Sequence, residues 1–206
     1  KIYARTQPYR YSAYLIDESP ANIPEARKIY ETLIANSDRR ERAWAWVGLA
    51  SIDYVSARPY RAIAELHKAA ELAPAMAVAY TALDDAENSF GHDEAELEAA
   101  RNSVRLLKGT GGADIDDRAR AIYLANEEGN VAFETGDIQS ALAYYRKAKE
   151  LPDFYGGVEA GRESEVVTLG FLHDAAGERR AVQDFPPAES DVIRAERAIS
   201  EANADF

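Results

Sequence analysis

Apolar residues recur along most of this chain at the three- and four-residue spacing of amphipathic helices. The pattern is clearest in residues 43–76, which hold two such helices in succession. Small residues face large ones across the pair, the arrangement in which two antiparallel helices interlock. Pro74 is expected to end the pair, because proline cannot continue a helix. The apolar positions are Trp46, Leu49 and Ala50 in the first helix and Ala62, Leu66 and Ala69 in the second.

The same helix-turn-helix pattern recurs at a period near 34 residues. It continues through residues 77–108, returns in residues 118–152, and is degenerate in residues 7–42 and 158–185. Gly91, Gly136 and Gly177 are expected to form the turns between paired helices. Residues 109–117 are predicted to be an insertion loop, and residues 188–204 a capping helix that covers the last apolar face. The pattern therefore predicts an all-α fold of stacked helical hairpins.

Some stretches depart from a regular repeat. Glu128 falls where an apolar residue is usual, so either the helix is locally rotated or the carboxylate is partly buried, and rotation is favoured. The second helix of residues 77–108 has few large apolar residues, so we expect it to pack less well than its predecessor. A polar link is expected at residues 38–42. The candidates to cap the first helix of the third repeat are Asp114, Asp116 and Asp117.

This period, with its pattern of small and large residues, resembles the tetratricopeptide repeat (TPR) superfamily. The resemblance covers most of the chain and implies one TPR-like domain over residues 1–206, an α-solenoid coiled into a right-handed superhelix. In such arrays the concave surface is lined mainly by the first helix of each repeat, and family members typically bind a peptide or another protein there. On this sequence, that surface would comprise Trp44, Val47, Ser51, Tyr54, Thr81, Asp85, Asn88, Tyr123, Asn126, Glu127, Asn130 and Phe133.

The resemblance therefore implies an interaction scaffold or adaptor, or the sensing part of a larger regulator. Aromatic rings and side-chain amides suit a polypeptide ligand, because amides pair with backbone donors and acceptors while rings bury apolar side chains. Co-chaperone TPR domains hold an acidic tail with cations. Here those positions are Val47, Ser51, Ala82, Tyr123 and Glu127, so the cationic clamp is absent. The alternatives are a self-association module, which would make homo-oligomers, and an accessory domain of a larger enzyme.

Net charge and cysteine content narrow the classes of partner. The net charge of −12 disfavours nucleic acid and favours neutral or basic protein partners. The sequence has no cysteine, which excludes disulfides and thiolate chemistry. No apolar run reaches the length of a membrane span, and no positively charged start with an apolar segment suggests a signal peptide. The chain starts at Lys1, so we expect a fragment or a processed form. The compartment is unknown; cytoplasm is slightly favoured, and periplasm stays possible if a leader was removed.

Catalytic and metal-binding patterns are absent from the sequence. His67, His92 and His173 fall in different repeats, and none has a second ligand three or four residues away. Adjacent carboxylates on a helix point in different directions, so they make poor acid–base pairs. Residues 108–117 are rich in glycine but lack the strand and the Lys-Ser/Thr of a phosphate loop. We therefore expect no catalytic residues, no metal and no cofactor.

Overall fold

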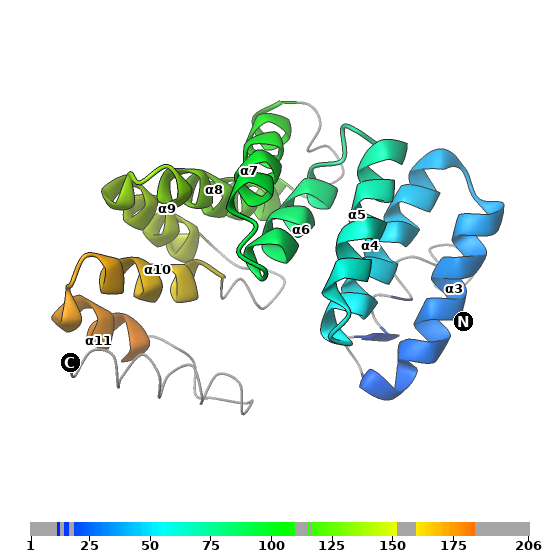
Figure 1. Cartoon of the computed structure of the whole chain (residues 1–206), viewed down its shortest axis with the longest axis horizontal. Coiled ribbons are helices and arrows are strands. Elements are labelled where there is room, and N and C mark those ends of the chain that lie inside the picture. The colour runs from blue at the N-terminus through cyan, green and yellow to red at the C-terminus, as the bar shows by residue number, and fades with distance from the viewer. Residues whose placement is uncertain are drawn as a thin grey trace. The chain divides into compact units, whose positions relative to one another are not determined.

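The computed structural model is helical in the parts of the chain that it describes, which are Ser12, Leu15, Ile16, residues 19–109, Ile115, residues 117–151 and residues 160–183 (Figure 1). The chain divides into two compact units, Lys1–Asp114 (unit 1) and Ile115–Phe206 (unit 2). The division falls inside the stretch predicted to be an insertion loop. The capping helix predicted at residues 188–204 lies outside the described residues.

Unit 1 is a series of helices in which each packs against the next along the chain (Figure 1). Two hairpins, α4 with α5 and α6 with α7, coincide with the repeats predicted at residues 43–76 and 77–108. Gly91 lies in the turn of the second hairpin at φ +64°, a conformation that glycine adopts without strain. The elements are η1 (Pro20–Asn22), α3 (Ile23–Asn36), α4 (Arg39–Val55), α5 (Pro59–Leu72), α6 (Ala77–Asn88) and α7 (Asp93–Lys108).

Helix α4 begins earlier than the repeat pattern suggested. The polar link predicted at residues 38–42 is helical from Arg39 onward. The reason is Asp38, whose side chain accepts hydrogen bonds from the backbone N–H groups of Arg40 and Glu41 and so caps the helix. Helix α5 begins with Pro59, which fits the first helical position because its missing N–H would have had no partner there.

The core of unit 1 confirms the small-to-large packing predicted between α4 and α5. Ala50, Ala62, Leu66 and Ala69 are buried in one hydrophobic cluster, which continues into α6 and α7. Leu49 is buried in a second cluster, against Tyr30 and Leu33 of α3. Trp46 is half-buried between the two clusters, and the ammonium group of Lys68 lies 4.3 Å from its ring centroid.

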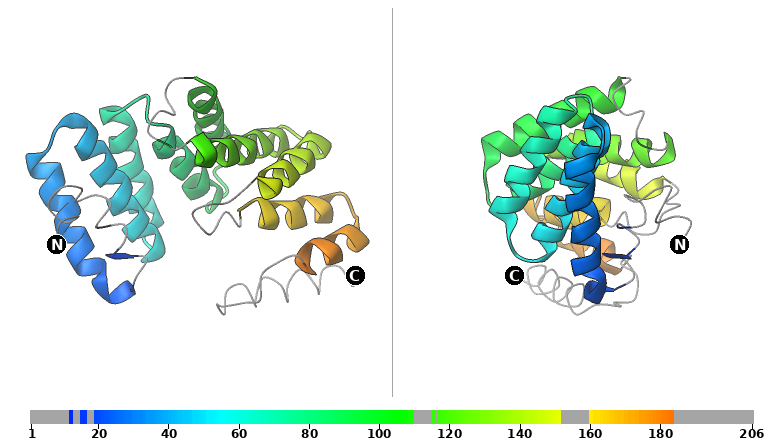
Figure 2. Two further views of the ribbon diagram at one scale, coloured as in Figure 1. Left: turned by 180° about the vertical axis from the view of Figure 1, so that it is seen from behind. Right: turned by 90° about the vertical axis from the view of Figure 1, so that its right-hand side faces the viewer.

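The described part of unit 2 contains two hairpins, which Figure 2 shows in two further views. The first hairpin turns at Gly136, which has φ +82°, as predicted. The second does not turn at Gly177, which lies inside α11. Asp174 accepts a hydrogen bond from the Gly177 N–H and so starts the helix before the glycine, while His173 takes the positive φ of the turn. The elements are α8 (Asp117–Glu134), α9 (Ile138–Glu150), α10 (Ala160–Phe171) and α11 (Ala175–Gln183).

Helix α8 is not rotated, contrary to the favoured prediction. Ala125, Gly129 and Ala132 are buried, as an unrotated repeat requires, and Glu128 is half-buried. The alternative of a partly buried carboxylate therefore holds. Asp117 is the first residue of α8 rather than its cap, and the other two candidate caps lie outside the described residues.

Candidate interaction surface

The predicted binding residues of unit 1 lie on α4 and α6, but three of them are covered by neighbouring helices. Val47 is buried in the core shared by the two hairpins. The Thr81 hydroxyl lies 2.8 Å from that of Ser103 on α7, where both side chains are buried. Trp44 is half-buried against the same core. These three residues therefore hold the hairpins together, and Val47 and Thr81 offer little surface to a partner.

The other four predicted residues of unit 1 are exposed, and the side chains of three of them make local hydrogen bonds. The Tyr54 hydroxyl lies 2.6 Å from that of Ser89, which links the end of α4 to the end of α6. Asn88 donates a 2.8 Å bond to Glu96, and the Ser51 hydroxyl donates to a backbone carbonyl of its own helix. Surrounding protein raises the Asp85 pKa to about 6 by desolvation, although its side chain still meets solvent. Polar groups on this surface are therefore oriented.

The predicted residues of unit 2 lie on α8 and are less accessible. Glu127 is buried, while Tyr123, Asn126, Asn130 and Phe133 are half-buried. Asn130 accepts a 2.9 Å hydrogen bond from the Tyr145 hydroxyl of α9. Phe133 packs edge to face with Phe171 of α10, with ring centroids 5.0 Å apart. An aromatic pair thus joins two successive first helices on the predicted face.

Exposed apolar side chains concentrate on the first helices of the hairpins. Among the described residues, five large hydrophobic side chains are exposed: Tyr54, Val55, Tyr60, Val167 and Phe171. Four of the five belong to α4 or α10, the first helices of their hairpins. The fifth, Tyr60, is the second residue of α5, which is the second helix of its hairpin. Apolar groups left outside the core in this way mark interaction sites on soluble proteins. We call the exposed side of α4, α6, α8 and α10, considered within each unit, the first-helix surface.

The sequence analysis did not identify Val167 and Phe171. Val166 and Leu169 of the same helix are buried in the core. Val167 and Phe171 are four residues apart, so they lie on a helix face other than that of Val166 and Leu169. A helix with two apolar faces was the available signal, because one hairpin partner can cover only one of them.

Buried carboxylates hold the helices of each unit together through ion pairs. Asp53 of α4 is fully buried and pairs with Arg27 of α3, with Arg58, which precedes α5, and with Arg61 of α5; the latter two distances are 2.7 Å. In unit 2, Glu165 of α10 lies 2.8 Å from both Arg146 and Lys149 of α9. Burial opposes the charge on Glu165, but these two cations outweigh it and hold the Glu165 pKa below its usual value. Charge therefore contributes to the cohesion of the scaffold.

A pH-dependent stability is expected from Glu65, which is buried beside Asp53. Burial, and then the Asp53 charge, raise the Glu65 pKa. A carboxyl group with a raised pKa in the folded state favours folding through its protonated form. This contribution to the free energy of unfolding is complete below the pKa of the unfolded state, about 4.3, and is lost as pH rises through the pKa of the folded state. The Glu65→Gln variant has no carboxyl group to ionise at this position. The difference in free energy of unfolding, variant minus wild type, should therefore grow as pH rises from 4 to 7. Urea unfolding at several pH values tests this, and a constant difference would contradict it.

Two of the three histidines, His67 and His92, approach the same carboxylate, that of Glu87. His92 Nδ1 lies 2.6 Å from a Glu87 oxygen, and His67 Nε2 lies 3.9 Å from the other. Within the part of the chain that the structure describes, no group of three His, Cys, Asp or Glu side chains could hold a metal ion. In that same part, no helix combines the length and the apolar character of a membrane span.

Comparisons with known proteins support the fold. No protein-family model matches the chain, and no curated protein sequence matches it. Among solved structures, the crystal structure of the APC/C hetero-tetramer Cut9-Hcn1 contains a similar chain, with a TM-score of 0.67 and 17% sequence identity. The match covers 97% of this chain and 35% of the other, so this chain spans about a third of that protein's length. The prediction of an all-α fold built of stacked helical hairpins is confirmed for the described residues, and the fold is similar to that of the matched chain.

Proposed function

We propose that this chain is a non-catalytic scaffold that binds a protein or peptide through its first-helix surface. The observation that carries the proposal is the concentration of exposed apolar side chains on α4 and α10. In a stack of hairpins, a second helix packs against the helices before and after it, as a first helix does. The number of neighbouring helices therefore does not explain why exposed apolar side chains are commoner on first helices. Apolar side chains that remain exposed cost free energy in water unless a partner covers them.

The polar part of the same surface fits a polypeptide. Asn88 and Asp85 in unit 1, and Asn130 in unit 2, can pair with backbone N–H and C=O groups of a ligand. Their hydrogen bonds to neighbouring helices fix Asn88 and Asn130 before binding, which lowers the entropy lost on association. The similar solved chain comes from a hetero-tetramer, so a fold of this kind does occur in a protein assembly.

The test of the proposed function is affinity capture of partners by wild-type protein and by matched variants, read by quantitative mass spectrometry. Tyr54→Ala with Val167→Ser removes exposed apolar groups from both units and should reduce capture about tenfold. Arg101→Ala with Lys147→Ala changes exposed residues of second helices and should leave capture unchanged. Equal capture by all three proteins, or equal loss in both variants, would contradict a role for the first-helix surface.

A further inference from the structure

A groove lies on another side of unit 1, between the second helices α5 and α7. It has a volume of about 350 Å³. Tyr80 and Leu83 of α6 line it from below, while α5 and α7 contribute its walls. These two residues lie on a different helical face from Thr81, Asp85 and Asn88, so the groove is separate from the first-helix surface. Its volume is near the lower end for ligand pockets and suits a few side chains of a polypeptide.

The lining of this α5–α7 groove is apolar with acidic sides. Its small walls include Ala70, Pro74, Ala95 and Ala99, which let a backbone approach closely. The described residues that line it include three carboxylates, Glu71, Glu87 and Glu98, and no lysine or arginine. Glu71 and Glu98 are exposed, so they can form new ion pairs, while Glu87 is buried and paired with histidine. The charge of the groove is therefore complementary to a basic segment.

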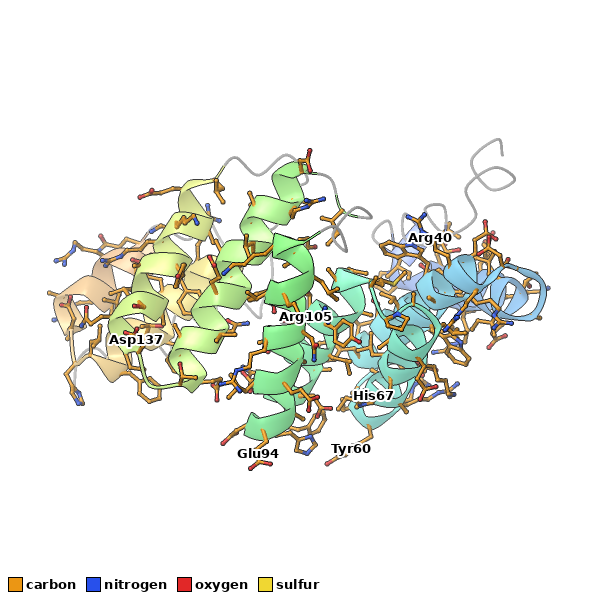
Figure 3. All side chains as sticks on the ribbon, turned by 90° about the horizontal axis from the view of Figure 1, so that it is seen from above. Arg40, Tyr60, His67, Glu94, Arg105 and Asp137 are labelled. Atoms are coloured by element: carbon orange, nitrogen blue, oxygen red, sulfur yellow. The ribbon has the colours of Figure 1, made fainter. Side chains whose placement is uncertain are left out.

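Two stacked aromatic rings lie near one end of the groove. The rings of Tyr60 and Phe90 stack with centroids 4.6 Å apart, and both lie near the ring of His92, which contacts Glu87. Tyr60 is 69% exposed, although it stacks on a second ring. In Figure 3, Tyr60 marks the start of α5, and Glu94, the second residue of α7, marks the start of that helix. An aromatic face beside carboxylates favours a lysine or arginine side chain through cation–π and Coulomb attraction.

Two arginines lie next to the lining of the groove, and neither belongs to it. Arg39 donates a 3.0 Å hydrogen bond to the Glu71 carbonyl, and Arg105 donates a 3.2 Å bond to Asn102. Neither bond uses the side-chain carboxylate of Glu71 or Glu98, the two exposed acids of the lining.

We propose that the α5–α7 groove binds a lysine- or arginine-bearing segment of a partner protein. The proposal rests on the proposed scaffold function only for the class of ligand, a polypeptide, since it concerns a different surface. Exposed Glu98 and Glu71 supply the ion pairs, Tyr60 and Phe90 supply the aromatic faces, and the small alanines of the walls admit the backbone.

The test uses two short fluorescein-labelled peptides, one of alternating lysine and alanine and one with glutamine in place of lysine. Binding is measured by fluorescence anisotropy at about 0.15 M salt. This salt concentration screens the attraction of the peptide to the overall negative charge of the protein. The lysine peptide should bind at least about tenfold more tightly than the glutamine peptide. Glu71→Gln with Glu98→Gln should remove most of this difference, whereas Glu31→Gln with Glu41→Gln, which changes the same charge on exposed sites elsewhere in unit 1, should not.

A second pair of variants separates the groove from general electrostatics. Ala95→Trp fills the groove without changing charge and should lower the affinity for the lysine peptide about tenfold, while Ala64→Trp on the exposed face of α5 should not. Equal effects of groove and control variants, or no preference for lysine over glutamine, would overturn the proposal. Tyr54→Ala with Val167→Ser should leave peptide binding intact. A failure of the groove and a failure of the first-helix surface are thereby distinguished.

Discussion

Replacing Asp53 with alanine is expected to lower the free energy of unfolding of unit 1 by about 3 kcal/mol. Asp53 is fully buried and is the common partner of Arg27 of α3, Arg61 of α5 and Arg58, the residue before α5. Without it, three like charges face one another. Arg58 and Arg61 are about half-exposed and can regain water, so most of the cost comes from Arg27, which is 20% exposed. The loss is therefore placed at the lower end for a broken buried ion pair.

Tryptophan fluorescence during urea unfolding measures this loss in unit 1 alone. The sequence has two tryptophans, Trp44 and Trp46, and both lie in α4. Glu41→Ala is the control, because this exposed acid of the same helix should change the free energy of unfolding by no more than about 0.5 kcal/mol. If Asp53→Ala were as mild as Glu41→Ala, the three arginines would not depend on Asp53, and the ion pairs would be incidental.

The hairpins could be predicted from the sequence because their signals are local. Small and large residues alternate on faces that meet within one hairpin, as Ala62, Leu66 and Ala69 do against Ala50. Glycine or proline marks the ends of the helices in these hairpins. Gly91 and Gly136 have positive φ, which explains why glycine occupies these two turns. The turn predicted at Gly177 was wrong, because a glycine also fits inside a helix that Asp174 has already started.

The buried charges could not be predicted, because their partners are distant in sequence. Asp53 is 26 residues from Arg27, and Glu165 is 19 residues from Arg146. A carboxylate within a helical pattern is usually interpreted as exposed, and nothing along the chain shows which arginine will reach it. Only the packing of successive helices brings these groups together, so the tertiary structure determines whether an acidic side chain lies on the surface or in the core.

The candidate site shows the same limit. Repeat position predicts which helix lines a surface, yet it does not predict which of its residues an adjacent hairpin covers. Val47 and Thr81 satisfied the pattern but are buried, whereas Tyr54 and Asn88 satisfied it and are exposed. The α5–α7 groove was outside the pattern altogether, because it forms between second helices of two hairpins.

Two glycines of unit 2 are expected to respond oppositely to valine, although both lie within helices. A side chain at Gly129 would collide with the ring of Tyr145, whereas one at Gly170 would meet nothing within 4 Å. Tyr145 is buried and bound to Asn130, so its ring cannot move aside. Gly129→Val should therefore lower the free energy of unfolding of unit 2 by about 3 kcal/mol. Gly170→Val should raise it slightly, by about 0.4 kcal/mol, because valine has the better helix propensity.

Hydrogen exchange of peptides from α8, α9 and α10 reads this difference directly, since protection falls with the local free energy of opening. Tryptophan fluorescence, which reports unit 1, should be unchanged in both variants and serves as the internal control. Adding Tyr145→Ala to Gly129→Val removes the ring that causes the collision, so the double variant should lose less than the sum of its single losses. If the losses simply add, the collision is not what makes glycine necessary, and the close contact of α8 with α9 does not depend on it.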